Sequence, residues 1–373
     1  MSTTPTSPER DIPVPPPSTA STPHERSTPV PTSTTRTAAA DSKAANHRPG
    51  PLRRALSAVG VQNVSLLMAI ALVVAIIGSQ NPLFFTVANL RVIGTAIAIS
   101  GLLAIVQTIV IILGALDISV GSIAGLTSVT SAMIFSVTGA AALGVGGAIL
   151  IGVVCGLVNG CIIVFGRVNP VIATLATLAA YKGVAQLVSD GRAQGYTGAD
   201  PFFVFLARGS IAGVPTLIWV LILVAVLAHI VLRYTTVGRN IYAVGGNDVA
   251  SRLAGIDINR YILGVYMVTG AVAAIAGLLI TARTGSGQPV SGSEGLELEA
   301  ITAAALGGAA LKGGKGTIAG TILAVILLGI LTNGMTLLGV NSFWQNVAKG
   351  ALLVVAVIIQ QLRSGERRVG LPG

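Results

Sequence analysis

The sequence predicts an all-α fold, a polytopic membrane bundle of about ten transmembrane helices. Composition is the first reason, because 53% of the 373 residues are hydrophobic and only 10% are charged, too few polar side chains to cover a soluble surface. Run length is the second reason, because residues 61–362 contain many continuous apolar runs close to the ~20 residues that a spanning helix needs. A lipid-facing strand would instead alternate apolar and polar residues over about 10 positions.

The first 55 residues differ in composition from the rest of the chain. Residues 1–55 are rich in Ser, Thr and Pro and contain almost no large apolar side chains, so we expect a disordered cytoplasmic tail. The tail does not resemble a secretory signal, because the first apolar run begins only after Arg53 and Arg54. Residues 56–362 are predicted to form the transmembrane domain, and residues 363–373 a cytoplasmic C-terminal tail.

Ten apolar runs are the predicted spans. They are residues 61–79, 92–114, 121–138, 143–166, 171–188, 214–233, 261–283, 298–311, 317–334 and 344–362. The eighth run contains AITAAALGGAAL, which is short for a full crossing and dominated by small residues. Because small residues permit close backbone approach, we expect a broken or tightly packed helix held inside the bundle.

Basic residues predict the orientation of the spans. With the N-terminus in the cytoplasm, most Lys and Arg residues fall on the cytoplasmic side, as the positive-inside rule requires. Both chain ends and the polar insert at residues 234–260 then lie in the cytoplasm. The net charge of +10 is explained by loop orientation and not by nucleic-acid binding, because the basic residues are scattered at the ends of apolar runs.

Signatures of an enzyme or of a metal site are nearly absent. The segment GGAALKGGKGTIAG resembles a phosphate-binding loop, but Ala309 stands where the first glycine belongs, and Gly316 stands where Ser or Thr would bind magnesium. Cys155 and Cys161 share one apolar run, which favours buried small hydrophobes over redox or metal chemistry. The three histidines are too dispersed to build a metal site.

Polar residues within or beside the apolar runs carry more information. Asp117 is either a helix cap at the membrane edge or the polar wall of a passage. Asn159 needs a hydrogen-bond partner on another helix, and Asn169 precedes a proline that marks a helix start or a kink open to a cavity. The candidate translocation path consists of Asp117, Ser119, Asn159, Asn169 and Thr174.

Three acids precede or begin the eighth run, in the segment TGSGQPVSGSEGLELE. They are Glu294, Glu297 and Glu299. Acids are stabilised at helix N-termini, so capping explains them, and an external docking surface for a partner protein is the alternative.

The polar insert contains the segment TVGRNIYAVGGNDVASRLAGI, residues 236–256. Residues 245–247 predict a turn, and residues 248–254 predict a helix of about two turns that Gly255 ends. So short a helix is marginal alone in water, so its own bundle or a partner must hold it in place.

These segments together resemble the inner-membrane permease subunits of ABC importers for monosaccharides, of the ribose, xylose and galactose type. The resemblance covers about residues 80–362, through NPLFFTVANL, GALDISVGSI, GLVNGCIIVFGRVNPVIATLATLAAYKGVAQLVSDG, GRNIYAVGGNDVASRLAGI and SGQPVSGSEGLELEAITAAALGGAALKGGKGTIAGT. The family more often has Gly-Ile where this chain has Ala115 and Leu116, and Gly where it has Ala176. These departures from the family pattern concern the identity of the substrate and not membership of the family.

The resemblance implies a permease homodimer in the bacterial inner membrane that forms the translocation path for a monosaccharide. Its implied partners are an ABC ATPase subunit, an extracytoplasmic sugar-binding protein and membrane lipid. ATP and magnesium would bind to the ATPase, so this chain would hold no cofactor and catalyse no reaction. The helix at residues 247–255 is similar to the family's coupling helix. The candidate coupling residues are Gly238, Arg239, Gly246, Asn247, Ala250 and Gly255.

A self-sufficient secondary transporter or channel for a small polar solute is the alternative. It predicts acidic or histidine relays deep in the spans and often an inverted internal repeat. Asp117 is the one serious candidate for such a relay, and the sequence shows no clear repeat.

Overall fold

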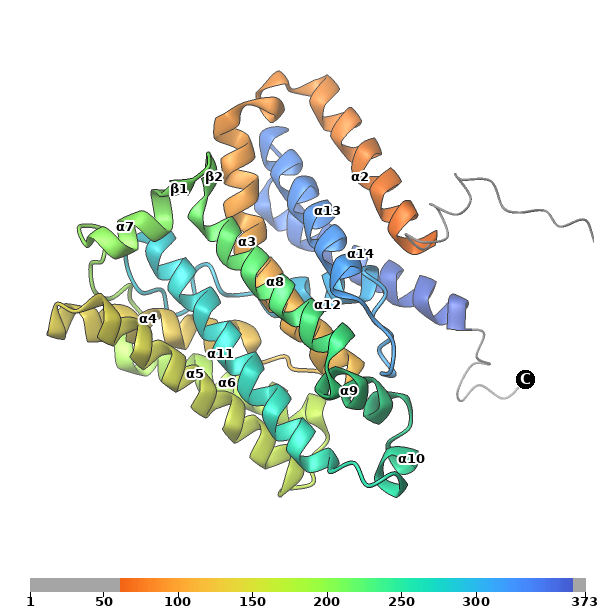
Figure 1. Ribbon diagram of the computed structural model, residues 1–373. Coiled ribbons are helices and arrows are strands. Elements are labelled where there is room, and N and C mark those ends of the chain that lie inside the picture. The colour runs from red at the N-terminus through yellow and green to blue at the C-terminus, as the bar shows by residue number, and fades with distance from the viewer. Residues whose placement is uncertain (1–60, 365–373) are drawn as a thin grey trace, which may run out of the picture. The chain divides into compact units, whose positions relative to one another are not determined.

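The computed structural model describes residues 61–364, all of which belong to one compact unit. The predicted N-terminal tail lies outside the described residues, as do residues 365–373 of the predicted C-terminal tail. The described chain is almost entirely helical (Figure 1).

The helices follow one another with short connections. They are α2 (Val61–Gln80), the 3-10 helix η1 (Pro82–Phe85), α3 (Val87–Ile112), α4 (Val120–Thr138), α5 (Ala141–Val164), α6 (Pro170–Ser189), α7 (Pro201–Arg208), α8 (Thr216–Tyr234), α9 (Thr236–Gly246), α10 (Asp248–Leu253), α11 (Ile258–Thr284), α12 (Leu296–Leu306), α13 (Ile318–Leu337) and α14 (Ser342–Ser364). A small antiparallel hairpin, β1 (Ser210–Ile211) and β2 (Val214–Pro215), connects α7 to α8.

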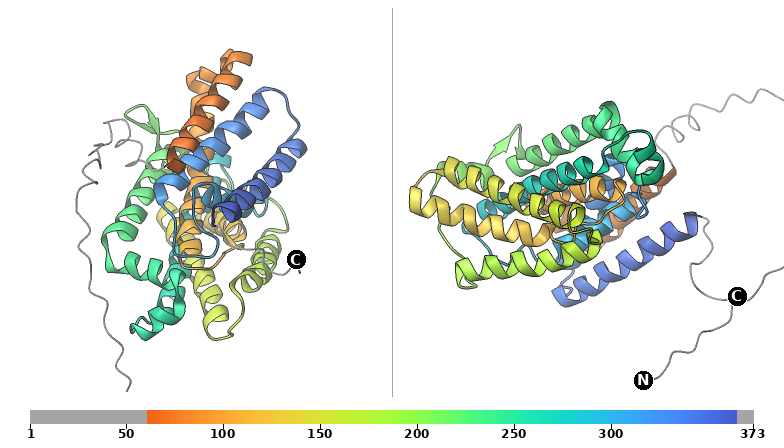
Figure 2. Two further views of the ribbon diagram at one scale, coloured as in Figure 1. Left: turned by 90° about the vertical axis from the view of Figure 1, so that its right-hand side faces the viewer. Right: turned by 90° about the horizontal axis from the view of Figure 1, so that it is seen from below.

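Within residues 61–364, eight helices are long and apolar enough to cross a membrane: α2, α3, α4, α5, α6, α8, α11 and α13. They coincide with eight of the ten predicted runs, and the polytopic helical bundle is confirmed. The remaining two runs are α12, which has only 11 residues, and α14, whose apolar part is the shorter stretch Ser342–Ile358. Figure 2 shows α14 at the margin of the described bundle, where it packs on α12 and α13.

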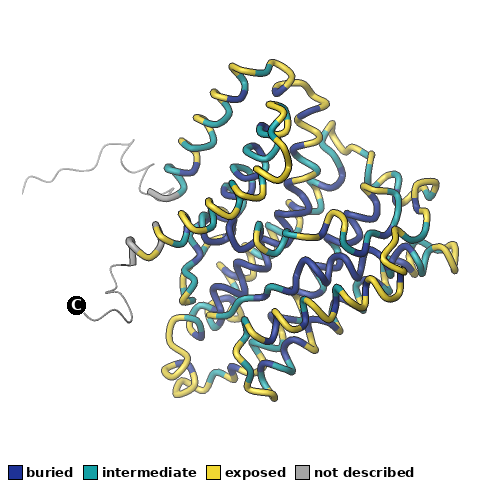
Figure 3. The backbone as a smooth tube through the Cα atoms, turned by 180° about the vertical axis from the view of Figure 1, so that it is seen from behind, coloured by how far each residue is buried: buried dark blue, intermediate teal, exposed yellow. Residues whose placement is uncertain are grey.

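Helix α3 forms the centre of the core. Every residue from Ile97 to Ile112 is buried, and α3 packs against α8, α11, α12 and α13. Figure 3 shows buried positions gathered in the interior helices and exposed positions along the outer faces. In a membrane, the exposed apolar side chains of the outer helices suit lipid.

Small residues set the register between α5 and α11. Gly152, Gly156 and Gly160 recur at four-residue spacing on α5. A Cβ at Gly152 would overlap the Gly270 carbonyl, and one at Gly156 would overlap the Tyr266 carbonyl. The backbones therefore touch directly, which only a small-xxx-small face permits.

Helix α4 begins level with the middle of α11. A Cβ at Gly277 of α11 would overlap Ala124 and Thr127 of α4, and one turn further along both helices Thr281 bonds to Ser128 at 2.8 Å. Gly121 is therefore level with a residue that lies a few positions before Gly277 along α11. Because the 27 residues of α11 span about 40 Å, the first turn of α4 lies at mid-depth.

The segment after α11, residues 285–295, turns back into the bundle. A Cβ at Gly287 would lie 2.7 Å from Val129, whereas Gly125 approaches the Pro289 carbonyl and Gly121 the Ser293 carbonyl. The segment therefore follows α4 back toward its first residue, over about 12 Å at the helical rise of 1.5 Å per residue.

Helix α12 then completes the crossing and ends where Gly307 packs on Thr321 of α13. The eighth predicted run is thus a short helix after a non-helical segment of turns and bends, as expected for a broken helix. The backbone of the segment finds partners inside the protein: Gly287 and Gln194 exchange hydrogen bonds of 2.8 and 3.0 Å, and Gln288 N donates to Ser128 Oγ at 3.0 Å. Non-helical backbone at membrane depth requires such partners.

Candidate functional site

Residues 113–119 connect α3 to α4 inside the bundle and carry the predicted path residue Asp117. Its side chain is fully buried, and its Oδ1 accepts hydrogen bonds from the backbone N (2.9 Å) and the Oγ (2.6 Å) of Ser119. Within the described residues its Oδ2 has no hydrogen-bond partner. Asp117 therefore stabilises the turn that leads into α4. This turn is buried inside the bundle, so Asp117 is not a helix cap at the membrane edge.

The same turn is bonded to two further helices. Asn159 Nδ2 on α5 donates to Ser119 Oγ at 2.8 Å, and the hydroxyl of Tyr181 on α6 donates to Asn159 Oδ1 at 3.1 Å. Three of the five predicted path residues thus form one buried polar network. Sequence reasoning missed Tyr181, because nothing in a run of small and apolar residues shows which neighbour its hydroxyl will reach.

The other two predicted path residues are not hydrogen-bonded to the side chains of this network. Asn169 is exposed, and its side chain caps α6 by accepting from Val171 N at 2.9 Å. Thr174 donates to the Pro170 carbonyl at 2.8 Å and reaches the Leu116 carbonyl at 3.4 Å. Neither residue, nor any member of the buried network, lines the three cavities described below.

A polar cavity of about 180 Å³ lies at mid-depth, beside the first turn of α4. Its lining comes from α4, α6, the segment that leads into α12 and the first turn of α12: Gly121, Ser122, Leu178, Lys182, Pro289, Val290, Ser293, Glu294 and Glu297. Lys182 Nζ forms an ion pair with Glu294 Oε1 at 2.7 Å. We call this space the mid-depth cavity.

The three acids of the sequence have three different environments. Glu294 pairs with Lys182, and Glu299 pairs with Lys349 of α14 at 2.8 Å. Glu297 Oε1 accepts from the backbone N of Gly295 at 3.3 Å, a contact of the capping kind. Capping therefore accounts for one acid, and the other two are held by lysines from distant parts of the chain.

Lys349 and Glu299 also line a second cavity, of about 280 Å³, between α3, α12, α13 and α14. An amide pair lies near it: Asn89 and Asn333 exchange hydrogen bonds of 2.8 and 3.1 Å, which join α3 to α13.

The polar insert folds as two helices, α9 and α10. The predicted turn at residues 245–247 is wrong in part, because Gly245 and Gly246 are the last residues of α9. Asn247 alone is extended, and its Oδ1 accepts from Ala250 N at 2.9 Å to cap α10. Gly255, at φ +82°, follows the end of α10 as predicted.

Helix α10 carries apolar side chains on its outside. Val249 is 64% exposed and Leu253 is 86% exposed. Five of the six predicted coupling residues are also exposed: Arg239, Gly246, Asn247, Ala250 and Gly255. Gly238 is buried, because α9 turns so sharply from α8 that a Cβ there would overlap the carbonyls of Val231 and Leu232.

The end of α9 is packed against the end of α3 and the loop at residues 307–317. A Cβ at Gly245 would overlap the carbonyl of Ile112, and that carbonyl accepts from Gly314 N at 2.8 Å. The Tyr242 hydroxyl donates to the Gly316 carbonyl at 2.7 Å, and burial raises the pKa of Tyr242 above its ordinary value. We call this three-way contact the junction.

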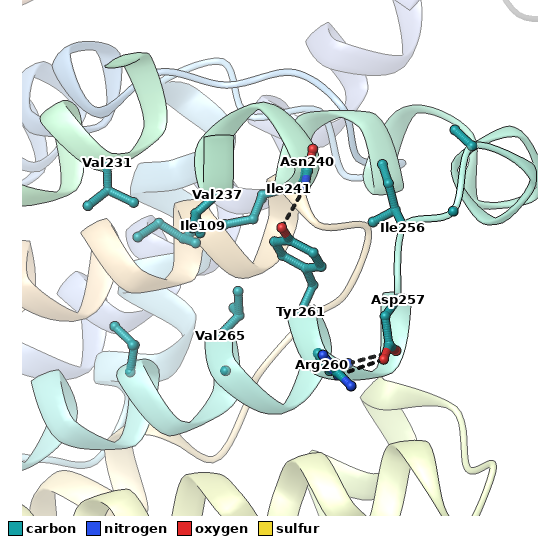
Figure 4. A pocket seen from close by; sticks show the side chains of 14 residues that line it. Ile109, Val231, Val237, Asn240, Ile241, Ile256, Asp257, Arg260, Tyr261 and Val265 are labelled. Carbon is teal, nitrogen blue, oxygen red and sulfur yellow. Dashed lines mark hydrogen bonds and ion pairs between the residues drawn. The ribbon is translucent and has the colours of Figure 1, made fainter. Parts of the chain in front are cut away.

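A larger cavity, of about 760 Å³, separates part of the insert from the bundle (Figure 4). Its walls are mostly apolar and come from α3, α8, α9 and α11. Figure 4 shows Asn240 directed at the hydroxyl of Tyr261, to which it donates, and Arg260 paired with Asp257 at 2.8 Å. The insert is therefore anchored at the junction and less closely packed beside this cavity.

Comparison with known proteins gives consistent matches over the membrane part. Residues 89–357 match the family model described as the permease component of branched-chain amino acid transport systems. The ribose import permease protein RbsC of Escherichia coli K12 is 37% identical over 309 residues, which cover 82% of this chain and 96% of that protein. RbsC of Bacillus subtilis 168 is 36% identical over 82% of this chain and 94% of its own length. The L-arabinose transport system permease protein AraH of E. coli K12 is 36% identical over 77% of this chain and 87% of its own length. No solved structure matches the chain.

Proposed function

The chain belongs to the family of branched-chain amino acid transport system permease components, and from this membership we propose that it is the permease subunit of an ABC importer for a monosaccharide. The relatives named for ribose and arabinose support the sugar class. The observation that carries a transport role is that two non-helical segments, residues 113–119 and 285–295, both end beside the first turn of α4 at mid-depth. Such broken segments, each followed by a helix N-terminus, are typical of solute sites in transporters.

We further propose that α10 docks on a cytoplasmic ATPase subunit. Exposed apolar side chains on a short polar helix are stabilised when a partner covers them, and α10 carries two, Val249 and Leu253. Arg239, Arg252 and Lys312 lie on or near the insert, which supports a cytoplasmic location by the positive-inside rule. Both chain ends would then also be cytoplasmic, and ATP and magnesium would bind to the ATPase.

Contacts at the junction could transmit a movement of α10 to the interior of the bundle. Gly245 touches the carbonyl of Ile112, the last residue of α3, and the connection that follows carries Asp117. Because Ser119 precedes α4 directly and bonds to Asn159 of α5, a shift of the connection would be transmitted to both helices. The permease contributes to coupling only if these contacts differ between the two states of the ATPase.

The complete importer would contain two copies of this chain in lipid, two ATPases and an extracytoplasmic sugar-binding protein. ATP binding would draw the ATPases and both α10 helices together and open the path to the outside, where the binding protein releases sugar. Hydrolysis would reset the permease.

Uptake into proteoliposomes tests this proposal against a self-sufficient transporter. The permease is reconstituted with and without its ATPase and binding protein, and the uptake of labelled D-ribose and L-arabinose is measured. We expect uptake only with ATP and both partners. Uptake by this chain alone under a proton or sodium gradient would refute the importer assignment.

A further inference from the structure

We propose that the mid-depth cavity is a contact site for the solute in passage, in which Lys182, Glu294 and Glu297 exchange hydrogen bonds with the hydroxyl groups of a sugar. This inference rests on the proposed function and assigns it a site within the chain. The predicted path residues do not line the cavity, although Ser122 of its lining lies one turn from Ser119.

The position of the cavity is the first argument. It lies where the first turn of α4, the middle of α6 and the residues leading into α12 meet, level with the middle of α11. A solute that crosses between the two ends of the bundle must pass this level. The start of α4 also lies at this level, where the backbone carbonyls of the lining residues Pro289 and Ser293 pack against Gly125 and Gly121 and add polar groups that need no side chain.

The absence of a side chain at Gly121 is the second argument. A Cβ at this position would overlap Glu297 Oε2 and would lie 3.0 Å from the Ser293 carbonyl. The glycine therefore leaves space for a carboxylate beside the helix start. Ser122, the next residue, is buried and directs its hydroxyl to the Ser119 carbonyl at 2.8 Å.

Charge and exposure are the third argument. The side chains of Lys182 and Glu294 are 37% and 66% exposed, so this ion pair cannot face hydrocarbon. Ionisable groups at membrane depth are rare, face protein or water, and mark the paths of solutes. The pair therefore faces water or protein and not lipid, as a contact site for a polar solute requires.

The mixture of charges selects the class of solute. Carboxylates accept hydrogen bonds from hydroxyl groups and an ammonium donates to them, so a neutral polyol can bond to both. The two carboxylates would repel a free anion, and Lys182 offsets one of the two negative charges that would attract a free cation. A zwitterionic amino acid is the competing chemistry, and the experiment includes one.

A second ion pair provides a matched control. Lys349 and Glu299 lie 2.8 Å apart, but the Glu299 side chain is only 14% exposed, and the pair lines the cavity between α3, α12, α13 and α14. This pair joins α14 to α12. It lies outside the mid-depth cavity.

The first test uses the importer reconstituted with its ATPase and binding protein in proteoliposomes. Glu297→Gln and Lys182→Gln are compared with the control Lys349→Gln for uptake of D-ribose and L-arabinose. We expect a fall in uptake of about tenfold or more for the first two variants, since each loses a charged hydrogen-bond partner. Hydrolysis of ATP stimulated by the binding protein should stay within about twofold of wild type, because α10 and the junction are untouched.

The second test measures directly whether a solute occupies the mid-depth cavity. In the same reconstituted importer, with Cys155 and Cys161 replaced by serine, Ser122→Cys places a thiol at the cavity wall. D-ribose should slow its reaction with a small thiol reagent, whereas L-leucine should not. Equal protection by L-leucine would overturn the assignment to polyols, and no protection by either solute would overturn the site.

The outcomes separate this inference from the proposed function. If the wild-type importer takes up neither sugar, the sugar class fails, and the inference fails with it. If the wild type transports but Glu297→Gln and Lys182→Gln match it, or if Lys349→Gln loses as much uptake as they do, the mid-depth cavity is not the contact site.

Discussion

Two adjacent glycines at the end of α9 should respond to alanine in opposite directions. A methyl group at Gly245 would overlap the Ile112 carbonyl and would lie 2.8 Å from Gly314 N, so the hydrogen bond between these two groups must open. A methyl group at Gly246 would meet no atom within 4 Å. The pair therefore tests the close packing of the junction with almost no change in chemistry.

The magnitude follows from three effects. Overpacking costs about 1–3 kcal/mol, and the lost backbone hydrogen bond costs about 0.5–1.5 kcal/mol. Alanine in place of a helical glycine returns about 0.5–1 kcal/mol. We expect Gly245→Ala to lower the free energy of unfolding by about 2 kcal/mol, whereas Gly246→Ala should be neutral or slightly stabilising.

The chain carries its own reporter for the measurement. Cys155 is buried on α5, so in a Cys161→Ser background, which removes the partly exposed second thiol, a thiol-reactive fluorophore labels it only when the purified permease unfolds on heating. At about 2–4 °C per kcal/mol, Gly245→Ala should melt about 4–8 °C below wild type. If Gly245→Ala melts at or above the temperature of Gly246→Ala, the end of α9 is not packed on α3 as described.

Three further substitutions test the surface of α10 and the turn into α4. Leu253→Asp should leave the melting temperature unchanged, since the side chain is 86% exposed, but should abolish most stimulation of the partner ATPase by the binding protein. Undiminished stimulation would show that the ATPase docks elsewhere. Asp117→Ala should destabilise the fold by about 2–4 kcal/mol, because both donors of Ser119 lose their acceptor. Asp117→Asn, whose amide oxygen can still accept, should cost about 1 kcal/mol or less in the same melting assay, and an equal loss in both variants would show that charge, not the acceptor, holds the turn.

Local sequence signals predicted most helices well. Continuous apolar runs predicted all eight of the apolar membrane helices within residues 61–364, because lipid requires every backbone group to be bonded within its own segment. Asn247 and Gly255 also predicted the start and end of α10, since capping depends on nearest neighbours alone.

The turn predicted at residues 245–247 shows where local signals fail. Glycines normally weaken a helix, yet α9 continues through Gly245 and Gly246. The reason is tertiary, because only a residue without a side chain allows α9 to contact Ile112 at the junction.

The sequence by itself determined the class of the protein, its helices and its family, because these depend on composition, run length and motif order. Only the tertiary structure decided the depth of each polar group. Gly121 and Glu297 lie far apart in the chain, and they meet at the first turn of α4 because small residues on α4, α5 and α11 let the backbones pack in one register. That register comes from contacts between helices, and it also places Lys182 beside Glu294. Neither segment alone contains a sequence pattern that predicts this ion pair.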